Sequence, residues 1–442
     1  MDAAAHKLAE FACDFSFDDL ADEATHALKL RLLDALATSL AASQAPPVEA
    51  ARTLARATSS DPEAQVLITG ETTTMEDAAY ANALMVQYWD YADVYLHGGH
   101  PSTTLGPVLA VADATGASGR DALQAMAIAY ETFCCLSDSA PLGVGAGPGL
   151  RVGTATALAA SRILGLNVDH TAEAIALTIA GSMSPVVPRD RQLSSWRVGS
   201  SASGSYNGVR AARSASAGIK GPIEPFIALG AGKAAELVPL GGRGSESRIL
   251  YSLLKPRAAE YHAQASIAAA LELRDQINVP DITGIDAYVY AHALGGIGRG
   301  VKLQPNDVDT ALHSLSYLVS AALLDGDVSP AQFTPERMAS ADVRGLMAKV
   351  TVQEDPAYTE PYHALIASRL EITTTSGKRH TDEVHQPKGH YENPMTDAEV
   401  ETKFRRYATP LLSHKATDSI IERVWNLESE PDLTGLFADL RA

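Results

Sequence analysis

The chain has 442 residues, of which 46% are hydrophobic and 20% charged, so it is long enough for two or three domains and has the composition of a globular protein. Its net charge of -18 argues against nucleic acids and anionic membrane surfaces as partners. The three cysteines, Cys13, Cys134 and Cys135, form neither a disulfide framework nor a metal-binding pattern, and no secretory signal or transmembrane run is recognisable. We therefore expect a cytoplasmic protein.

Apolar residues recur at three- and four-residue steps through the first half of the chain, which is typical of amphipathic helices. Such segments cover residues 20–43, 77–95, 105–115, 119–137, 153–164 and 199–216. Many of their residues are alanine, and small residues allow helices to approach closely. This half of the chain is therefore predicted to form a packed all-helical domain.

The segment Trp89 to Gly106, WDYADVYLHGGHPSTTLG, gathers polar residues. Asp90 and Asp93 are three residues apart, and a helix would place both carboxylates on one face. A Gly-Gly pair then ends the helix, and the following proline favours an extended backbone at His100. A histidine on a loop beside two carboxylates can act as a general acid or base, because its ordinary pKa of ~6.5 lies close to working pH. An ordinary turn is the alternative interpretation.

Arginines gather in the segment PRDRQLSSWRVGS, which carries Arg189, Arg191 and Arg197 ahead of the small-residue helix. A helix N-terminus adds positive potential, and guanidinium groups bind carboxylates through paired hydrogen bonds. The segment therefore predicts a pocket for a di- or tricarboxylate. Surface ion pairs with nearby acidic residues are the alternative.

Lys255 ends the apolar run RILYSLLK, and the polar residues of AEYHAQ, His262 among them, follow within a few positions. Burial would lower the pKa of this lysine and suit it to proton transfer or to pairing with a carboxylate. Further along, His313 and Tyr317 are four residues apart and would share a helix face, for which an interior hydrogen bond is the alternative. The loop Lys388-Gly389-His390 is interpreted as structural.

The pattern changes near residue 280 to a mixture of strands and helices. Strand-like runs cover residues 282–293, 346–353 and 368–375, and helical patterns cover 307–324 and 335–348. This mixture predicts a smaller α+β domain. A capped helix over 396–407 is then consistent with a C-terminus that rejoins the first domain.

Motifs for nucleotide binding, serine nucleophiles and zinc proteases are absent, since the chain has no GxxxxGK[ST], GxGxxG, GxSxG or HExxH pattern. We therefore expect proton-transfer chemistry on an anionic small molecule, without a metal or organic cofactor.

Several short motifs occur along nearly the whole chain in a fixed order. They are Asp90-x-x-Asp93 with His100-Pro101-Ser102, then SSWR, LLKPRAAEYHAQ, LHSLSYLVSAALLDG, and KGH with a later NP before a KF-containing helix. In this order they resemble the MmgE/PrpD family, which includes 2-methylcitrate dehydratases, cis-aconitate decarboxylases and iminodisuccinate epimerases. The resemblance implies a mainly α fold, with a large helical domain of residues 1–262 and 392–442 and an α+β lid domain of residues 263–391. It also implies an active site in the cleft and a homodimer.

The resemblance further implies dehydration of a hydroxy di- or tricarboxylate such as 2-methylcitrate by general acid and base catalysis. The residues expected to be catalytic are Asp90, His100, Lys255 and Tyr317. The residues expected to bind substrate are Asp93, Ser102, Arg191, Arg197, His262 and His313. We expect His100 and Asp90 to manage one proton transfer. Lys255 and Tyr317 are expected to manage the other or to bind the substrate's carboxylates, and Arg197 with Arg191 to anchor a distal carboxylate.

Two positions depart from the cis-aconitate decarboxylases. Those proteins carry a lysine where this chain has Arg197, and a histidine near the place of Gly147. Because arginine does not readily shuttle a proton, both departures argue against decarboxylation. An epimerase or isomerase, which needs the same proton removal, or a decarboxylase acting on a related polycarboxylate remains an alternative. A non-catalytic binding protein of the same fold is a second alternative.

Overall fold

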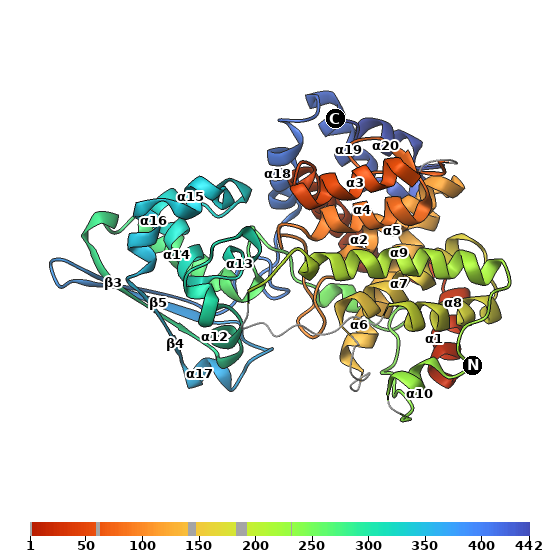
Figure 1. The fold of residues 1–442 in the computed structure, drawn as a ribbon, viewed down its shortest axis with the longest axis horizontal. Coiled ribbons are helices and arrows are strands. Elements are labelled where there is room, and N and C mark those ends of the chain that lie inside the picture. Colours follow the sequence, from red (N-terminus) through yellow and green to blue (C-terminus); the bar gives the residue numbers. More distant parts are fainter. Residues whose placement is uncertain (1, 59–61, 140–146, 183–191, 231) are drawn as a thin grey trace.

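The computed structural model describes residues 2–58, 62–139, 147–182, 192–230 and 232–442, and the structural statements below concern these residues. Within them the fold is mainly α, as the sequence predicts, and the helices and strands are arranged in two lobes (Figure 1). Two large hydrophobic cores correspond to these lobes. No helix in the described ranges combines the length and the apolar composition needed to cross a bilayer.

Helices from both ends of the chain build the larger lobe. They are α1 (Ala3–Asp14), α2 (Asp22–Ala42), α3 (Pro46–Thr58), α4 (Met75–Gln87), α5 (Leu105–Thr115), α6 (Gly119–Asp138), α7 (Pro148–Ile163), α8 (Val168–Gly181), α9 (Trp196–Ser216), α10 (Pro225–Leu229), α18 (Asp397–Ala408), α19 (His414–Trp425) and α20 (Thr434–Asp439). The C-terminal helix α18 packs against α2, so the chain returns to the lobe in which it began (Figure 1).

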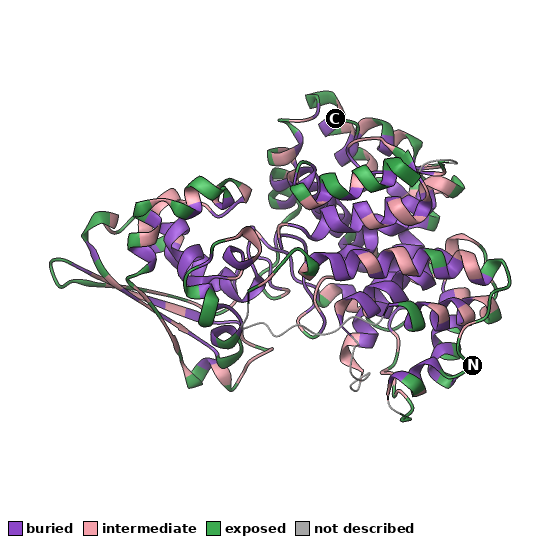
Figure 2. Cartoon of the chain, in the orientation of Figure 1, coloured by how far each residue is buried: buried purple, intermediate pink, exposed green. Residues whose placement is uncertain are grey.

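Small residues allow α7 and α9 to pack closely. A Cβ atom on Gly204 would lie 2.1 Å from the carbonyl oxygen of Gly149, and one on Gly208 would lie 2.5 Å from that of Gly153. Any larger residue at these positions would force the helices apart. Buried residues accordingly dominate the inner faces of α4, α7 and α9 (Figure 2).

The smaller lobe contains a four-stranded sheet of order β4-β3-β5-β6. Its strands are β3 (Ile282–Val289), β4 (Val350–Glu354), β5 (Ser368–Thr374) and β6 (Arg379–Val384). Strand β3 runs parallel to β4, pairing Ile285 with Val350, and antiparallel to β5, which is antiparallel to β6. Alternate residues of β5 are buried because helices pack on one face of the sheet.

The helices of this lobe include two that pack on each other and on the sheet, α11 (Gln264–Arg274) and α14 (Leu315–Asp325). The others are α12 (Ala291–Ile297), α13 (Val308–Ala311), α15 (Pro335–Ala339), α16 (Ala341–Met347) and α17 (Pro356–Thr359).

Several predicted elements differ from those observed. The helix expected over 77–95 ends at Gln87, and the one expected over 307–324 is divided into α13 and α14, because Ser314 caps the start of α14 through its side chain. The helix expected over 335–348 is likewise divided at Ser340. The larger lobe is also not purely helical, since β1 (Ala64–Gln65) and β2 (Thr72–Thr73) form a short antiparallel pair.

The two lobes meet along extended segments. Val94, which follows α4, and Leu253 form an antiparallel bridge in which both N···O distances are 2.8 Å. These segments carry the polar residues that the sequence places at a site.

Candidate active site

Asp90 lies in the loop that follows α4 and has a left-handed backbone with φ of 50°. Aspartate tolerates this conformation better than most residues, and such outliers cluster at functional sites. Because the helix has already ended, Asp90 and Asp93 do not share a helix face, which corrects the sequence-based expectation. The Asp90 carboxylate instead faces residues from both lobes.

Lys255 approaches Asp90 from the segment that enters the smaller lobe. Its ammonium group contacts the Asp90 carboxylate and donates a hydrogen bond of 2.7 Å to the Asp90 carbonyl oxygen. The Lys255 side chain has an exposed fraction of 0%. The buried Lys255 ammonium therefore has no direct access to solvent, and it influences the site through its contact with Asp90.

Two histidines face the two oxygens of the Asp90 carboxylate. His100 places Nε2 3.4 Å from Oδ1, and His313 places Nε2 3.2 Å from Oδ2. The helix division noted above leaves His313 outside α14, so it does not share a helix face with Tyr317, contrary to expectation. These imidazoles are the more accessible members of the group, with exposed fractions of 17% and 14% against 6% for Asp90.

Hydrogen bonds to backbone carbonyls define the tautomer of both imidazoles. His100 Nδ1 is 2.7 Å from the carbonyl oxygen of Asp93, and His313 Nδ1 is 3.0 Å from that of Asp309. A carbonyl oxygen only accepts, so each Nδ1 carries the proton and donates it. Each Nε2 is therefore the nitrogen that can take up or release a proton beside Asp90.

Electrostatic interactions shift the pKa values of Asp90 and His100. Burial would raise the pKa of Asp90, but Lys255, His100 and His313 together hold that pKa well below its ordinary value. Burial, followed by the charge of Lys255, lowers the pKa of His100, and the charge of Asp90 opposes this shift. The site therefore favours an ionised carboxylate beside a neutral His100 imidazole.

Arg197 lies at the start of α9 and connects the two lobes. Its Nε is 2.7 Å from Oδ1 of Asp309 in α13, and its Nη1 is 4.0 Å from Oδ2 of Asp90. It also donates to the carbonyl oxygen of Tyr88. Arg189 and Arg191, which the sequence groups with Arg197, lie outside the described residues.

Asp93 organises the loop that carries His100. Its carboxylate is buried and accepts hydrogen bonds from the backbone N–H of Ser102, at 3.0 Å, and from the hydroxyl of Tyr130, at 2.9 Å. The Ser102 hydroxyl itself is buried and has no hydrogen-bond partner within the described part of the chain. A buried hydroxyl without a partner is free to bind a polar group of a ligand.

His262 and Tyr317 make contacts within the smaller lobe. His262 Nδ1 bonds to the Tyr290 hydroxyl, and its Nε2 is 3.4 Å from a carboxylate oxygen of Glu260. The Tyr317 hydroxyl donates to the backbone carbonyl of Gln332. The structure thus brings together Asp90, His100, Lys255, Arg197 and His313, whereas these two side chains bond elsewhere.

Sequence reasoning missed Asp309, which positions both Arg197 and His313, and Lys403, which contacts the backbone of Lys255. Lys403 is the lysine of the KF-containing helix, so the sequence analysis found the motif but did not predict that this lysine contacts the site. Nothing local marks the Asp309 carboxylate, because its partner Arg197 is 112 residues away in sequence.

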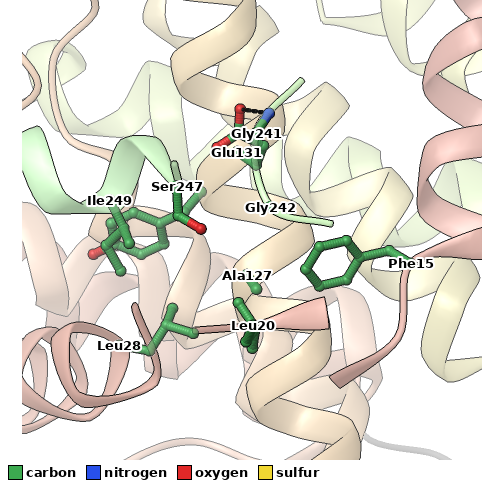
Figure 3. Close-up of a pocket in the computed structure, with 10 residues that line it drawn as sticks. Phe15, Leu20, Leu28, Ala127, Glu131, Gly241, Gly242, Ser247 and Ile249 are labelled. Carbon is green, nitrogen blue, oxygen red and sulfur yellow. Dashed lines mark hydrogen bonds between the residues drawn. The ribbon is translucent and has the colours of Figure 1, made fainter. Parts of the chain in front are cut away.

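Two hollows in the described part of the structure lie away from this group. A cavity of about 10 Å³ within the larger lobe is lined by Phe15, Ala127 and Glu131, whose carboxylate accepts a hydrogen bond of 2.6 Å from the backbone of Gly241 (Figure 3). It has room for about one water molecule. A larger groove lies between α3, α4 and α9 and is lined by residues such as Leu54 and Tyr206.

The fold and the site define a two-domain, mainly α-helical protein in which carboxylate, imidazole and cationic side chains from both lobes meet in a buried junction. The chain belongs to the MmgE/PrpD family, since residues 6–236 match the family's N-terminal domain and residues 258–427 match its C-terminal domain.

Its relatives include two kinds of enzyme. Human cis-aconitate decarboxylase is 26% identical over 384 residues, which cover 81% of this chain and 78% of that protein. The 2-methylcitrate dehydratase of Cupriavidus necator is 27% identical over 332 residues, covering 68% of each chain. That of Escherichia coli K12 is 27% identical over 349 residues, covering 71% of each chain.

Proposed function

We propose that this protein is a hydro-lyase that removes water from a hydroxy di- or tricarboxylate such as 2-methylcitrate. The observation that carries the proposal is the buried Asp90 carboxylate with two imidazole Nε2 atoms within 3.4 Å and with Lys255 and Arg197 beside it. Family membership and the dehydratases among the relatives support it.

Elimination of water needs a base and an acid on the same substrate. The base removes a proton from the carbon next to a carboxylate, the electron pair forms the C=C bond, and the C–O bond breaks as the acid protonates the departing hydroxide. The Nε2 atoms of His100 and His313 can serve as this base and this acid, and we assign one proton transfer to each histidine. Asp90, kept ionised by Lys255, holds both imidazoles in place and stabilises whichever becomes charged.

Substrate carboxylates require cations and hydrogen-bond donors. We assign Arg197 to a distal carboxylate, because a guanidinium group binds a carboxylate through two hydrogen bonds. The unpartnered Ser102 hydroxyl is suited to a substrate oxygen. Tyr317, whose hydroxyl bonds to Gln332, is assigned to packing rather than to proton transfer in this scheme.

The test is incubation of the purified protein with 2-methylcitrate and with citrate, following the ultraviolet absorbance of the new alkene and the products by NMR. We expect an unsaturated acid and one water per turnover. Deuterium incorporation from D₂O without water loss would instead identify an epimerase, and release of CO₂ a decarboxylase. A folded protein that turns over no hydroxy di- or tricarboxylate would overturn the proposal in favour of a binding role.

A further inference from the structure

Four consecutive residues ending at Lys255 are each held by a different distant segment. Arg31 donates to the carbonyl oxygen of Ser252 at 2.8 Å, Val94 pairs with Leu253, the carbonyl oxygen of Gly389 accepts from Leu254 at 3.0 Å, and the ammonium of Lys403 donates to the carbonyl oxygen of Lys255 at 3.0 Å. Contacts from four distant segments therefore fix the backbone that positions Lys255 beside Asp90.

Lys403 differs from Arg31, Val94 and Gly389 because its single ammonium group binds the residue next to Asp90 as well as Lys255. Its ammonium donates to the carbonyl oxygen of Tyr91 at 2.9 Å, as well as to that of Lys255, and its remaining hydrogen bond, of 2.7 Å, goes to Asp34 in α2. An ammonium group has three protons, so all of its donors are used. One side chain thus connects the residue next to Asp90 with the residue that pairs with Asp90.

The surroundings of Lys403 are costly for a charge. Its side chain is 4% exposed and that of Asp34 is 1% exposed. The Tyr91 ring, whose centroid lies 3.6 Å from the ammonium, offsets only part of this cost. Burial lowers the pKa of Lys403 and raises that of Asp34, and each group opposes the shift of the other. Because apolar residues often replace such buried pairs without loss of stability, stability alone does not explain this pair.

We propose that Lys403 is a positioning residue that holds Lys255 against Asp90 by binding the backbone on both sides of their contact. It lies behind the site and reaches the reaction only through these two residues. The effect expected on kcat rests on the proposed hydro-lyase function, whereas the displacement of Lys255 from Asp90 does not.

The central test is the double variant Asp34→Leu/Lys403→Met, which removes one negative and one positive charge and fills the space with apolar atoms. We expect it to fold, with kcat lower by about a hundredfold, as for a misplacement of about 1 Å at a catalytic group, and with KM within a few-fold of wild type. Arg405→Met is the matched control, because Arg405 lies on the same helix and pairs with exposed Asp418. It should leave kcat and KM unchanged.

A second readout does not depend on turnover. The His100 imidazole is titrated by NMR with labelled histidine, and His100→Gln identifies its signal. Asp90, Lys255 and Asp93 are the charged groups that influence it, and Lys255 lowers its pKa. If Lys255 moves away in the double variant, the pKa of His100 rises. A purely structural role for Lys403 would leave it unchanged.

If the double variant does not fold, Asp34→Asn distinguishes the effect of the ion pair from the effect of the backbone contacts. The amide oxygen still accepts from Lys403, which keeps its bonds to Tyr91 and Lys255, so the pKa of His100 should stay near wild type even if stability falls. Lys403→Met should raise that pKa. A folded variant lacking Lys403 with wild-type kcat and an unshifted His100 would overturn the proposal. An inactive wild type would reject the hydro-lyase function and leave the titration to decide the positioning role.

Discussion

Asp90 and Lys255 are 165 residues apart in the chain, yet the Lys255 ammonium contacts both the carboxylate and the carbonyl oxygen of Asp90. The contact is not symmetric. Asp90 also faces two imidazoles, whereas the hydrogen bonds described for the Lys255 ammonium all go to Asp90.

This asymmetry predicts unequal effects of removing either partner. Asp90→Asn leaves a buried ammonium without its counter-charge, and we expect it to lower the free energy of unfolding by about 3–5 kcal/mol. Lys255→Met leaves Asp90 near Arg197, 4.0 Å away, and beside two imidazoles that can take up a proton, so the loss should be smaller. Urea denaturation of both variants at neutral pH measures the difference, and equal losses would contradict this account.

His100→Gln should lower kcat of the proposed reaction by about 10²–10⁴-fold, because the Nε2 atom that exchanges a proton is lost. His385→Gln is the control, since His385 has an exposed fraction of 61% and pairs only with Glu383 among the described residues. Steady-state kinetics on the folded proteins decide the matter. Activity retained in His100→Gln would remove this residue from the mechanism.

The lowered pKa of His100 predicts a pH dependence of activity. If the neutral imidazole is the base, kcat/KM falls as the pH is lowered through the pKa of His100, which lies below its ordinary value of ~6.5. Lys255→Met removes a charge that lowers this pKa, so the acidic limb of the profile should move to higher pH. A limb at the same pH in both proteins would assign the ionisation to another group.

The lowered pKa of His100 also predicts a contribution to the free energy of unfolding that depends on pH. Because the folded protein binds the His100 proton less tightly than the unfolded chain does, this contribution is complete above a pH of ~6.5 and is lost as the pH falls towards the folded-state pKa. The difference in unfolding free energy between wild type and His100→Gln, measured across this range, isolates it. A stability advantage of wild type over His100→Gln that grows as the pH falls would contradict this prediction.

Arg197→Lys should raise KM about tenfold to a hundredfold, because lysine keeps the charge but loses the paired hydrogen bonds to a carboxylate. Arg213→Lys is the matched control on the same helix, where the arginine pairs with Glu63 and Glu76. An unchanged KM in Arg197→Lys would exclude Arg197 as the carboxylate anchor.

Gly389→Ala should displace the backbone that ends at Lys255. Gly389 has φ of 93°, and a Cβ atom would lie 2.1 Å from the carbonyl oxygen of Leu254. Gly377→Ala is a control for backbone strain alone, because its φ is 78° and its Cβ would meet nothing within 4 Å. We expect Gly377→Ala to cost about 1–2 kcal/mol without changing kcat. Gly389→Ala should cost more and lower kcat, and equal effects of the two would refute the steric argument.

Helices with a strong local pattern were predictable. The helix expected over 105–115 is α5, with the same bounds, because apolar spacing and the glycine that ends it are local properties. The loop conformation of His100 was also predictable, since the following proline begins a 3₁₀ turn over Pro101–Thr104 and His100 itself is not helical.

The end of α4 at Gln87 was not predictable. The residues that follow have helix-compatible spacing, but the backbone turns at Asp90, where its carbonyl and carboxylate both bind Lys255. Bonds to a distant segment thus override a local preference that amounts to less than about 1 kcal/mol per residue.

By itself, the sequence determined which segments become helices and strands, that two lobes form, and which polar residues are candidates, because periodicity, capping and residue chemistry act over a few neighbouring positions. Only the tertiary structure decided which candidates meet. Asp90 and His313 are candidates from loops of different lobes. Asp34 and Lys403, which the sequence did not mark as candidates, are 369 residues apart and meet because α18 packs on α2. Burial then makes the loss of one member of a pair costly, because the charge left behind in the interior would be unpaired.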